Sequence, residues 1–394
     1  MSSGNGASSK RLSRRGFIRI AGGGVILAAG GLALARCDGM PPDAIAAWRG
    51  PDAGERDLRK RLIAFAMLAP NPHNRQPWLV DLKTPDRITL YCDRERLLPA
   101  TDPYSRQIMI GHGTFLELLA QAAAAVGIRA DIRYFPKGEF GPQKIDARPV
   151  AEITLTKDAG VKPDPLFAQI LKRRTNREVF DRDRPLSATT AAALGSVTLD
   201  PAVRLSVETA SARMLPLRQL AIDGLVKELR TPHTFEESIQ LMRIGAGEIA
   251  QHRDGISIHG PMMWWLKRLG LLDKAALRDP SSQSFEVGLD MARDQGGSAM
   301  GFCWLTTADN TRTTQLKAGR AYVRLHLKAT ELGLAQQPMS QLLQEYPEMT
   351  ALQSKFLTTV GAKTGETVQM LARLGYAAPT GPAPRRPLAS LIKA

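Results

Sequence analysis

Residues 69–78, with the sequence APNPHNRQPW, decide how the rest of the chain is interpreted. Apolar residues recur at helical spacing from Leu58 to Ala69, and the prolines that follow end that helix. The residues after them predict a strand that begins at Trp78. The segment is therefore expected to be a polar loop between a helix and a strand, with Trp78 packed beneath it.

The polar side chains of this loop suggest a ligand with a flat, heteroatom-rich edge. Asn71, Asn74 and Gln76 carry amides, which both donate and accept hydrogen bonds. His73 is the titratable side chain expected nearest such a ligand, with helix capping or packing as its alternative role. The same composition also suits an ordinary polar turn over a buried tryptophan, so the spacing alone leaves both interpretations open.

Outward from the loop, the patterns predict a mixed chain of the α+β class. Strands are predicted at residues 78–80, 88–92, 131–135, 150–156, 203–209 and 302–307. Helices are predicted at residues 58–69, 113–126, 166–174 and 314–332. Residues 210–295 are predicted to be mostly helical.

Two long helices carry the same landmarks, which indicates internal duplication. The second set follows the first by 206 residues: Arg106, Gly113 and Gly127, then Arg312, Gly319 and Gly333. We therefore expect a linker at 36–57, a first half at 58–160 and a second half at 161–394. The second half then contains an insertion at about 210–295 that has no counterpart in the first.

A basic segment opens the second half. Residues 173–177 read RRTNR, and planar guanidinium groups match the oxygens of a phosphate dianion. Arg173, Arg174, Asn176 and Arg177 are therefore candidates for binding a phosphate. A solvated basic helix end is the alternative.

Two further segments become candidates through the family resemblance described below. Residues 333–340 read GLAQQPMS, in which Pro338, Met339 and Ser340 follow a glycine helix cap. An ordinary helix cap followed by a loop is the other interpretation. Near the C-terminus, Arg386 either adds a phosphate contact or is simply exposed.

The N-terminus predicts an export signal. Residues 13–19 read SRRGFIR, a short apolar stretch runs from Ile20 to Ala35, and an A-x-A cleavage pattern precedes Arg36. This pattern indicates the twin-arginine translocase as a partner and a periplasmic or membrane-associated location. Lipid attachment at Cys37 is the less favoured alternative, because Arg36 is not a small residue.

Composition narrows the class of protein. The chain has 394 residues, 43% of them hydrophobic, and a formal net charge of +15. The basic residues are scattered and aromatic residues make up 6%, which disfavours a nucleic-acid partner. Neither the six histidines nor the three cysteines have metal-ligand spacing, and Cys92 and Cys303 are expected to be buried thiols.

The loop at 69–78 resembles the A-P-S-x-x-N-x-Q-P-W signature of the nitroreductase family. With Asp102-Pro103 and Arg106 downstream, the chain is similar to the twin-arginine-exported, Acg-like branch of that family. The resemblance implies an FMN cofactor held by the amide loop, by the arginines at 173–177 and by the segment 338–340. The family's Glu-Gly near the flavin N5 is replaced here by Ser340-Gln341.

The resemblance also implies a nitroreductase-like fold of two degenerate halves, fused as an intramolecular pseudo-dimer with one FMN site. The expected activity is two-electron reduction of a nitro, quinone or enone acceptor, with NAD(P)H as a possible donor. The flavin carries the chemistry, so no catalytic side chain is required. The alternative is a protein that sequesters FMN in a site closed by the insertion. Trp264 and Trp265 in that insertion are expected to be core residues rather than a cover over the flavin.

Overall fold

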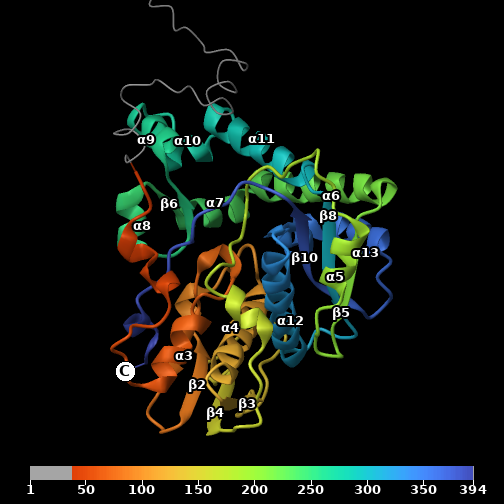
Figure 1. The fold of residues 1–394 in the computed structure, drawn as a ribbon. Helices are drawn as coiled ribbons and strands as arrows, with labels where there is room; N and C mark the ends of the chain where they lie inside the picture. The colour runs from red at the N-terminus through yellow and green to blue at the C-terminus, as the bar shows by residue number, and fades with distance from the viewer. Residues whose placement is uncertain (1–37, 394) are drawn as a thin grey trace, which may run out of the picture.

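The computed structural model describes residues 38–393, which form two four-stranded sheets and two long central helices. Figure 1 shows the two sheets on opposite sides of the helix pair, with a helical segment above them. The predicted export signal and Cys37 lie outside the described residues. Within residues 38–393, no helix is long and apolar enough to cross a membrane.

The first half is built from residues 58–157. Its elements are α3 (Leu58–Ala66), β1 (Trp78–Asp81), β2 (Arg87–Cys92), α4 (Arg106–Ala124), β3 (Ile128–Tyr134) and β4 (Ala151–Lys157). The strands pair antiparallel in the order β1-β2-β4-β3. Alternate residues of β2 are buried, as expected for a strand with one face on the core. Trp78 is fully buried beneath the 69–78 loop, as predicted.

The second half repeats this plan. Its elements are α5 (Ala188–Gly195), β5 (Arg204–Glu208), β8 (Gly301–Thr307), α12 (Arg312–Glu331), β9 (Ala335–Pro338) and β10 (Thr367–Gly375). The strand order β5-β8-β10-β9 reproduces that of the first sheet, again antiparallel throughout. In both halves the long helix connects the second strand to the third. The α+β class and the two-half organisation are therefore confirmed.

The sequence landmarks occupy equivalent places in the two halves. Arg106 begins α4 and Arg312 begins α12. Each guanidinium reaches into the opposite half: Arg106 donates to Val368 O, whereas Arg312 donates to Pro142 O. Gly127 and Gly333, which follow the two helices, have the same φ of 70°.

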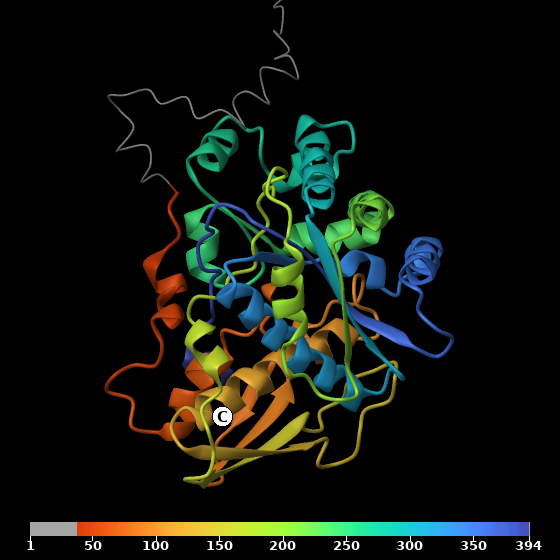
Figure 2. The same ribbon diagram turned by 45° about the vertical axis from the view of Figure 1, so that its right-hand side comes forward.

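The helices α4 and α12 cross where their two glycines meet. A Cβ added to Gly113 would overlap the carbonyl oxygen of Leu316, and one added to Gly319 would overlap that of Ile110. Each glycine therefore admits the backbone of the other helix, as the small residues of close helix crossings do. Figure 2 shows the two helices crossing at the centre of the molecule.

The insertion joins β5 to β8, where the first half has only a turn between β1 and β2. It comprises α6 (Ser211–Arg230), α7 (Pro232–Leu241), β6 (Met242–Ile244), α8 (Ala246–His252), β7 (Ile256–Ile258), α9 (Pro261–Arg268), α10 (Lys274–Arg278) and α11 (Gln283–Gly297). The strands β6 and β7 are a short parallel pair within a segment that was predicted to be helical. Phe235, Ile239 and Leu289 belong to a separate apolar cluster of this segment.

The prediction that Trp264 and Trp265 are core residues was wrong. Both lie on α9, which has no buried residue, and the side chain of Trp265 is 45% exposed. The two rings pack edge to face on each other, with centroids 4.8 Å apart, and α9 lies at the edge of the insertion.

Several boundaries also differ from the expected ones. The element expected at 166–174 is a short 3-10 helix, η5 (Pro165–Gln169), and α3 ends three residues before Ala69. The sequence patterns missed α5, α13 (Thr350–Val360), β9 and β10. The remaining 3-10 helices are η1 (Pro42–Ala44), η2 (Ala46–Arg49), η3 (Pro72–Asn74), η4 (Arg94–Arg96), η6 (Ser340–Leu343), η7 (Pro347–Met349) and η8 (Leu388–Leu391).

The C-terminal tail returns from the second half to the first. After β10, Ala383 O accepts a hydrogen bond from the Trp48 indole, and Arg385 N donates to Ala44 O. Farther along, Ile392 forms a parallel bridge with Val80 of β1. The tail thereby brings Arg385 and Arg386 against the 69–78 loop.

Candidate functional site

The 69–78 loop has an unusual backbone. His73, Asn74 and Gln76 all have positive φ, between 45° and 50°. Such values cost free energy for residues with a Cβ, and three of them within four residues need support from the surroundings. Strained backbone of this kind is concentrated at functional sites, so the loop is a candidate on its conformation alone.

The loop amides are engaged in hydrogen bonds within the protein. Asn71 Oδ1 accepts from Gln76 N, and Asn74 Nδ2 donates to Pro384 O. Gln76 is fully buried: Nε2 donates to Arg253 O, and Oε1 accepts from Arg386 N. These side chains therefore hold the loop, the tail and the insertion together. A direct cofactor contact by the three amides stays a prediction.

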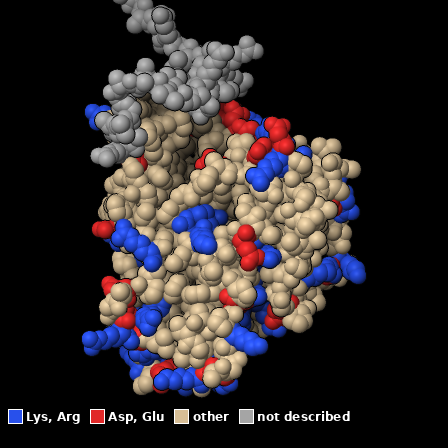
Figure 3. Space-filling model, viewed as in Figure 1, with Lys and Arg blue, Asp and Glu red and all other residues tan. Residues whose placement is uncertain are grey.

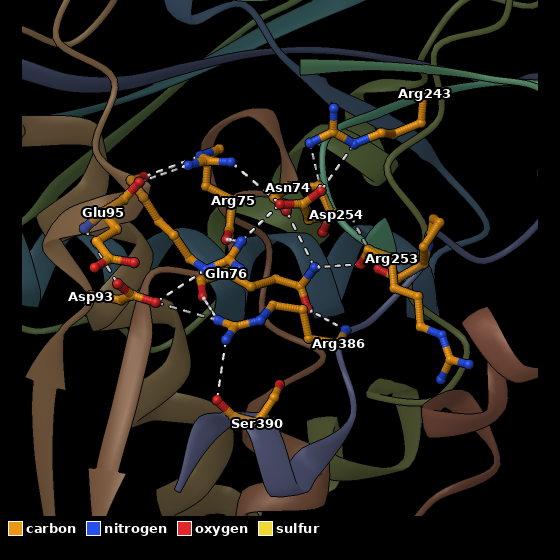
Figure 4. A network of polar contacts seen from close by, with 12 residues as sticks. Asn74, Arg75, Gln76, Asp93, Glu95, Arg243, Arg253, Asp254, Arg386 and Ser390 are labelled. Atoms are coloured by element: carbon orange, nitrogen blue, oxygen red, sulfur yellow. Dashed lines mark hydrogen bonds and ion pairs between the residues drawn. The ribbon is translucent and has the colours of Figure 1, made fainter. Parts of the chain in front are cut away.

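The insertion is fastened to this loop through Asp254, whose side chain is 6% exposed (Figure 4). Its Oδ2 atom accepts from Arg96 at 2.7 Å and from Arg75 at 3.3 Å. Its Oδ1 atom accepts from Arg243 at 2.8 Å. Burial opposes ionisation of this carboxyl group, but the hydrogen bonds and charges of Arg243 and Arg96 outweigh it and lower the pKa. We call this set the Asp254 latch.

A second basic cluster surrounds Trp48. The guanidinium carbons of Arg173, Arg174 and Arg385 lie 5.5, 4.3 and 5.1 Å from the centroid of a Trp48 ring. Burial, followed by the charges of Arg173 and Arg174, lowers the pKa of Arg385 well below its usual range. Within residues 38–393, none of the three arginines forms an ion pair with a carboxylate. Like charges gathered without a counterion favour an anionic ligand.

Arg385 itself is well supported. Its guanidinium donates to the carbonyl oxygens of Met67 and Leu68 and to the side chain of Asn74. Arg386 donates to Gln76 O and to Ser390 O. The two tail arginines are buried, so the alternative of simple exposure for Arg386 was wrong. A phosphate contact by Arg386 stays a prediction.

Arg177 is the exposed member of the arginine segment. Its side chain is exposed to solvent, yet enough protein surrounds it that desolvation lowers its pKa. It forms no hydrogen bond or ion pair with the described residues. An unpaired guanidinium that is open to solvent is suited to bind an anion. Figure 3 shows a recess on one face of the molecule, beside a central group of basic side chains.

His73 connects the loop to Arg177. Burial, followed by the charges of Arg177 and Arg75, lowers the pKa of His73 to about 4. The imidazole is therefore neutral at pH 7. Its Nδ1 atom is buried and has no partner among the described residues. The structure thus brings together the loop and the arginine segment, which the sequence predicted separately.

The segment 338–340 lies beyond β9. Pro338 pairs with Ala372 of β10, Met339 is buried, and Ser340 begins η6. A backbone hydrogen bond from Asn176 N to Gln336 O, at 3.1 Å, ties the arginine segment to β9. The side chain of Asn176 donates to Ala378 O, so it is also used within the protein.

The residues present fit a phosphorylated cofactor such as FMN. Buried polar atoms without a partner in residues 38–393 include Arg173 Nε, His73 Nδ1, the Tyr322 hydroxyl and both ends of the Gln336 amide. Leaving such atoms unsatisfied costs about 1–3 kcal/mol each. An anionic ligand with several acceptor oxygens would satisfy the donors among them.

Sequence reasoning missed Trp48, Asp254 and Tyr322. Each is brought to the site by tertiary structure from a segment without a motif of its own. The feature that marks Asp254 is the group of arginines around it, and these arginines come together only when the chain is folded.

The second half has a counterpart of this recess. The connection from α5 to β5 corresponds to the 69–78 loop, and Thr198 on it accepts from Arg324 Nε at 2.7 Å. A cavity of about 310 Å³ lies there, lined by Glu117, Asp200, Arg320 and Arg324 among others. Glu117 pairs with both arginines, at 2.8 and 2.7 Å. The charges in this second cavity are therefore compensated, unlike those around Trp48.

The described residues thus form an α+β protein with two matched halves and a cluster of arginines without acidic partners between them. No protein-family model matches the chain. It is 25% identical over 354 residues to "Putative NAD(P)H nitroreductase acg" of Mycobacterium tuberculosis, covering 84% of this chain and 94% of that one. A second putative NAD(P)H nitroreductase of that organism is 26% identical over 352 residues, covering 87% and 92%. The chain is therefore similar over most of its length to proteins named as nitroreductases.

Solved structures give weaker matches. A putative nitroreductase from Anabaena variabilis has 13% identity and a TM-score of 0.42, covering 86% of this chain and 90% of that one. The FMN-dependent nitroreductase NfnB from Mycobacterium smegmatis, in complex with NADPH, has 19% identity and a TM-score of 0.32, covering 56% and 94%. At these scores the matches carry no argument about the site, which rests on the geometry of this chain.

Proposed function

We propose that the chain is an FMN-dependent oxidoreductase of the nitroreductase class. The observation that carries this proposal is a group of arginines, Arg173, Arg174, Arg177 and Arg385, that have no acidic partner among residues 38–393 and lie beside a strained loop. Full-length similarity to proteins named as NAD(P)H nitroreductases supports the same assignment.

Each part of the site has a role in this proposal. The arginines bind the anionic end of the cofactor and neutralise its charge. The strained loop presents neutral His73 and its backbone toward the recess, while the buried Gln76 fixes the loop conformation. The flavin, when bound, supplies hydride transfer, so the chain needs to position and shield it rather than move a proton. The acceptor is a nitro, quinone or enone compound, and the donor is NAD(P)H.

The test is the visible absorption of the purified chain, followed by anaerobic addition of NADH or NADPH. Flavin bands that bleach within minutes would support an open, active site. A protein that cannot be reconstituted with FMN would refute the proposal. Arg173→Gln and Arg177→Gln are expected to weaken FMN binding, whereas Arg182→Gln, which removes an exposed pair with Asp294, serves as the control.

One observation favours the second function, an FMN-holding protein with little turnover. The Asp254 latch and the bond from Gln76 Nε2 to Arg253 O fasten the insertion directly onto the loop (Figure 4). A latched insertion would slow entry of a nicotinamide. Flavin bands that persist under excess NADPH, in a protein that retains FMN through gel filtration, would support holding.

We also propose that the fused halves bind one FMN per chain. The second cavity is lined by the Glu117–Arg320–Arg324 ion pairs, which leave neither of these two arginines uncompensated. A flavin-to-protein ratio of two would refute this.

Export by the twin-arginine route, proposed from residues 13–35, is compatible with insertion of the cofactor before transport. Fractionation of cells that express the chain, compared with an Arg14→Lys/Arg15→Lys variant, tests it. The variant should stay in the cytoplasm. An unchanged distribution would contradict the proposed route.

A further inference from the structure

Two buried polar side chains of the second half are left without partners at one place. Tyr322, on α12, is 3% exposed, and its hydroxyl forms no hydrogen bond with residues 38–393. Gln336, on β9, is fully buried, and neither its amide oxygen nor its amide nitrogen has a partner there. The Tyr322 hydroxyl lies beside the Gln336 amide without the geometry of a hydrogen bond.

The charged neighbours of this pair are cations. The Tyr322 hydroxyl interacts electrostatically with Arg173 and Arg177, neither of which forms an ion pair in the described part of the chain. Arg173 Nη1 lies 3.5 Å from His326 Nδ1, and the rings of Tyr322 and His326 are 5.9 Å apart. The hydrogen bond from Asn176 N to Gln336 O holds the arginine segment against β9. The hydroxyl and amide therefore lie beside the arginine segment 173–177.

The chemistry of the place selects the ligand. A hydroxyl and a primary amide offer donors, Arg173 Nε offers another, and two guanidinium groups supply uncompensated positive charge. A neutral flavin edge would leave that charge unbalanced. A phosphate monoester would satisfy the donors through its oxygens and neutralise the cations. Burial raises the pKa of Tyr322, so the hydroxyl is a neutral donor at physiological pH.

We infer that Tyr322 and Gln336 complete the binding pocket for the terminal phosphate of the cofactor, beside Arg173 and Arg177. This inference rests on the proposed FMN function and adds two positioning residues that lie outside every motif of the chain. It gives α12 a part in binding as well as in joining the halves. It also predicts that the chain distinguishes FMN from riboflavin through these side chains.

The test compares FMN with riboflavin, which lacks the phosphate. Flavin-free protein is titrated with each ligand by fluorescence quenching, for the wild type, Tyr322→Phe and Gln336→Leu. Loss of a hydrogen bond to a charged group is expected to weaken FMN about 10- to 100-fold and to leave riboflavin unchanged. Tyr346→Phe is the matched control, because Tyr346 is also buried with an unpartnered hydroxyl but has the acidic neighbour Glu228.

Equal weakening of FMN and riboflavin in Tyr322→Phe would overturn the inference, since it would indicate a structural role. No effect on either flavin would also overturn it. Failure of the wild type to bind any flavin would instead refute the proposed function. Thermal unfolding with added inorganic phosphate gives a readout independent of flavin: the wild type should be stabilised, and Tyr322→Phe much less so. Equal stabilisation of both would count against the inference.

Discussion

The Gly319→Ala substitution tests how the two halves are joined. The added methyl would overlap the carbonyl oxygen of Ile110, which belongs to the α4 backbone and cannot rotate away. The helices must separate by about 1 Å to restore ordinary contact distances. Overpacking of a close-packed interior costs about 1–3 kcal/mol. The better helix propensity of alanine returns about 1 kcal/mol. Because the obstructing atom belongs to the main chain, we expect an overpacking cost of about 3 kcal/mol. After the gain in helix propensity, the net loss is about 2 kcal/mol.

The assay is urea and thermal unfolding of the wild type and the variant. A loss of about 2 kcal/mol corresponds to a fall in Tm of about 3 °C for a folded unit of this size. Gly288→Ala is the control, because Gly288 lies in α11 and an added Cβ would meet no atom within 4 Å. That variant should be unchanged or slightly stabilised. A Gly319→Ala protein as stable as the wild type would refute the backbone contact between α4 and α12.

A double variant sharpens this test. Gly113→Ala should cost a similar amount, because a Cβ there would overlap Leu316 O. Since one separation of the helices accommodates both methyl groups, the combined loss should be smaller than the sum. Strict additivity would indicate that the two glycines act at independent sites.

Three further predictions concern the latch, acid stability and the thiols. Asp254→Asn should weaken the hold of the insertion on the loop and raise the dissociation rate of bound flavin at least about 10-fold. Stopped-flow measurement checks this, with the exposed Asp290→Asn as control. An unchanged rate would rule out a gating role for the latch. His73 has a pKa of about 4 in the folded protein against 6.5 unfolded. Its contribution to the free energy of unfolding is therefore fully present above pH 6.5 and is lost as pH falls toward 4, a fall of up to about 3 kcal/mol. His73→Gln should remove this part of the pH dependence measured by urea unfolding. Burial raises the pKa of Cys303 to about 12 and also raises that of Cys92. After treatment with a thiol reagent at pH 8, peptide mapping should therefore find both cysteines unmodified until the protein is denatured. Labelling in the native state would show that this part of the core opens.

The sequence patterns predicted those helices and strands that neighbouring residues determine. The helix ending before Pro70, the strands at Trp78 and Phe302, and the glycine caps at Gly127 and Gly333 follow from residue types that act within a few positions. β9 and β10 were missed because their residues, such as Gln336 and Arg373, are polar yet buried. Their burial depends on partners far away in the sequence, which no window of sequence contains.

The same distinction applies to the site. Arg173 and Arg177 were found because neighbouring arginines form a visible motif. Asp254 was not assigned a role, since its importance comes from three arginines that lie 11, 158 and 179 residues away. The loop amides were expected to face a ligand, but the folded chain engages them with the tail and the insertion. A motif thus located the site, whereas the contacts within it were set by the tertiary structure.

The covalent joining of the halves has a consequence for dilute protein. When two separate subunits enclose a site, dilution below their dissociation constant opens that site and releases whatever it holds. Here α4 and α12 meet within a single chain, and the tail returns from β10 to β1, so the effective concentration of one half near the other is fixed by connectivity. The integrity of the recess should therefore be independent of how many copies of the protein are present. A single molecule, diluted without limit, keeps the complete binding site.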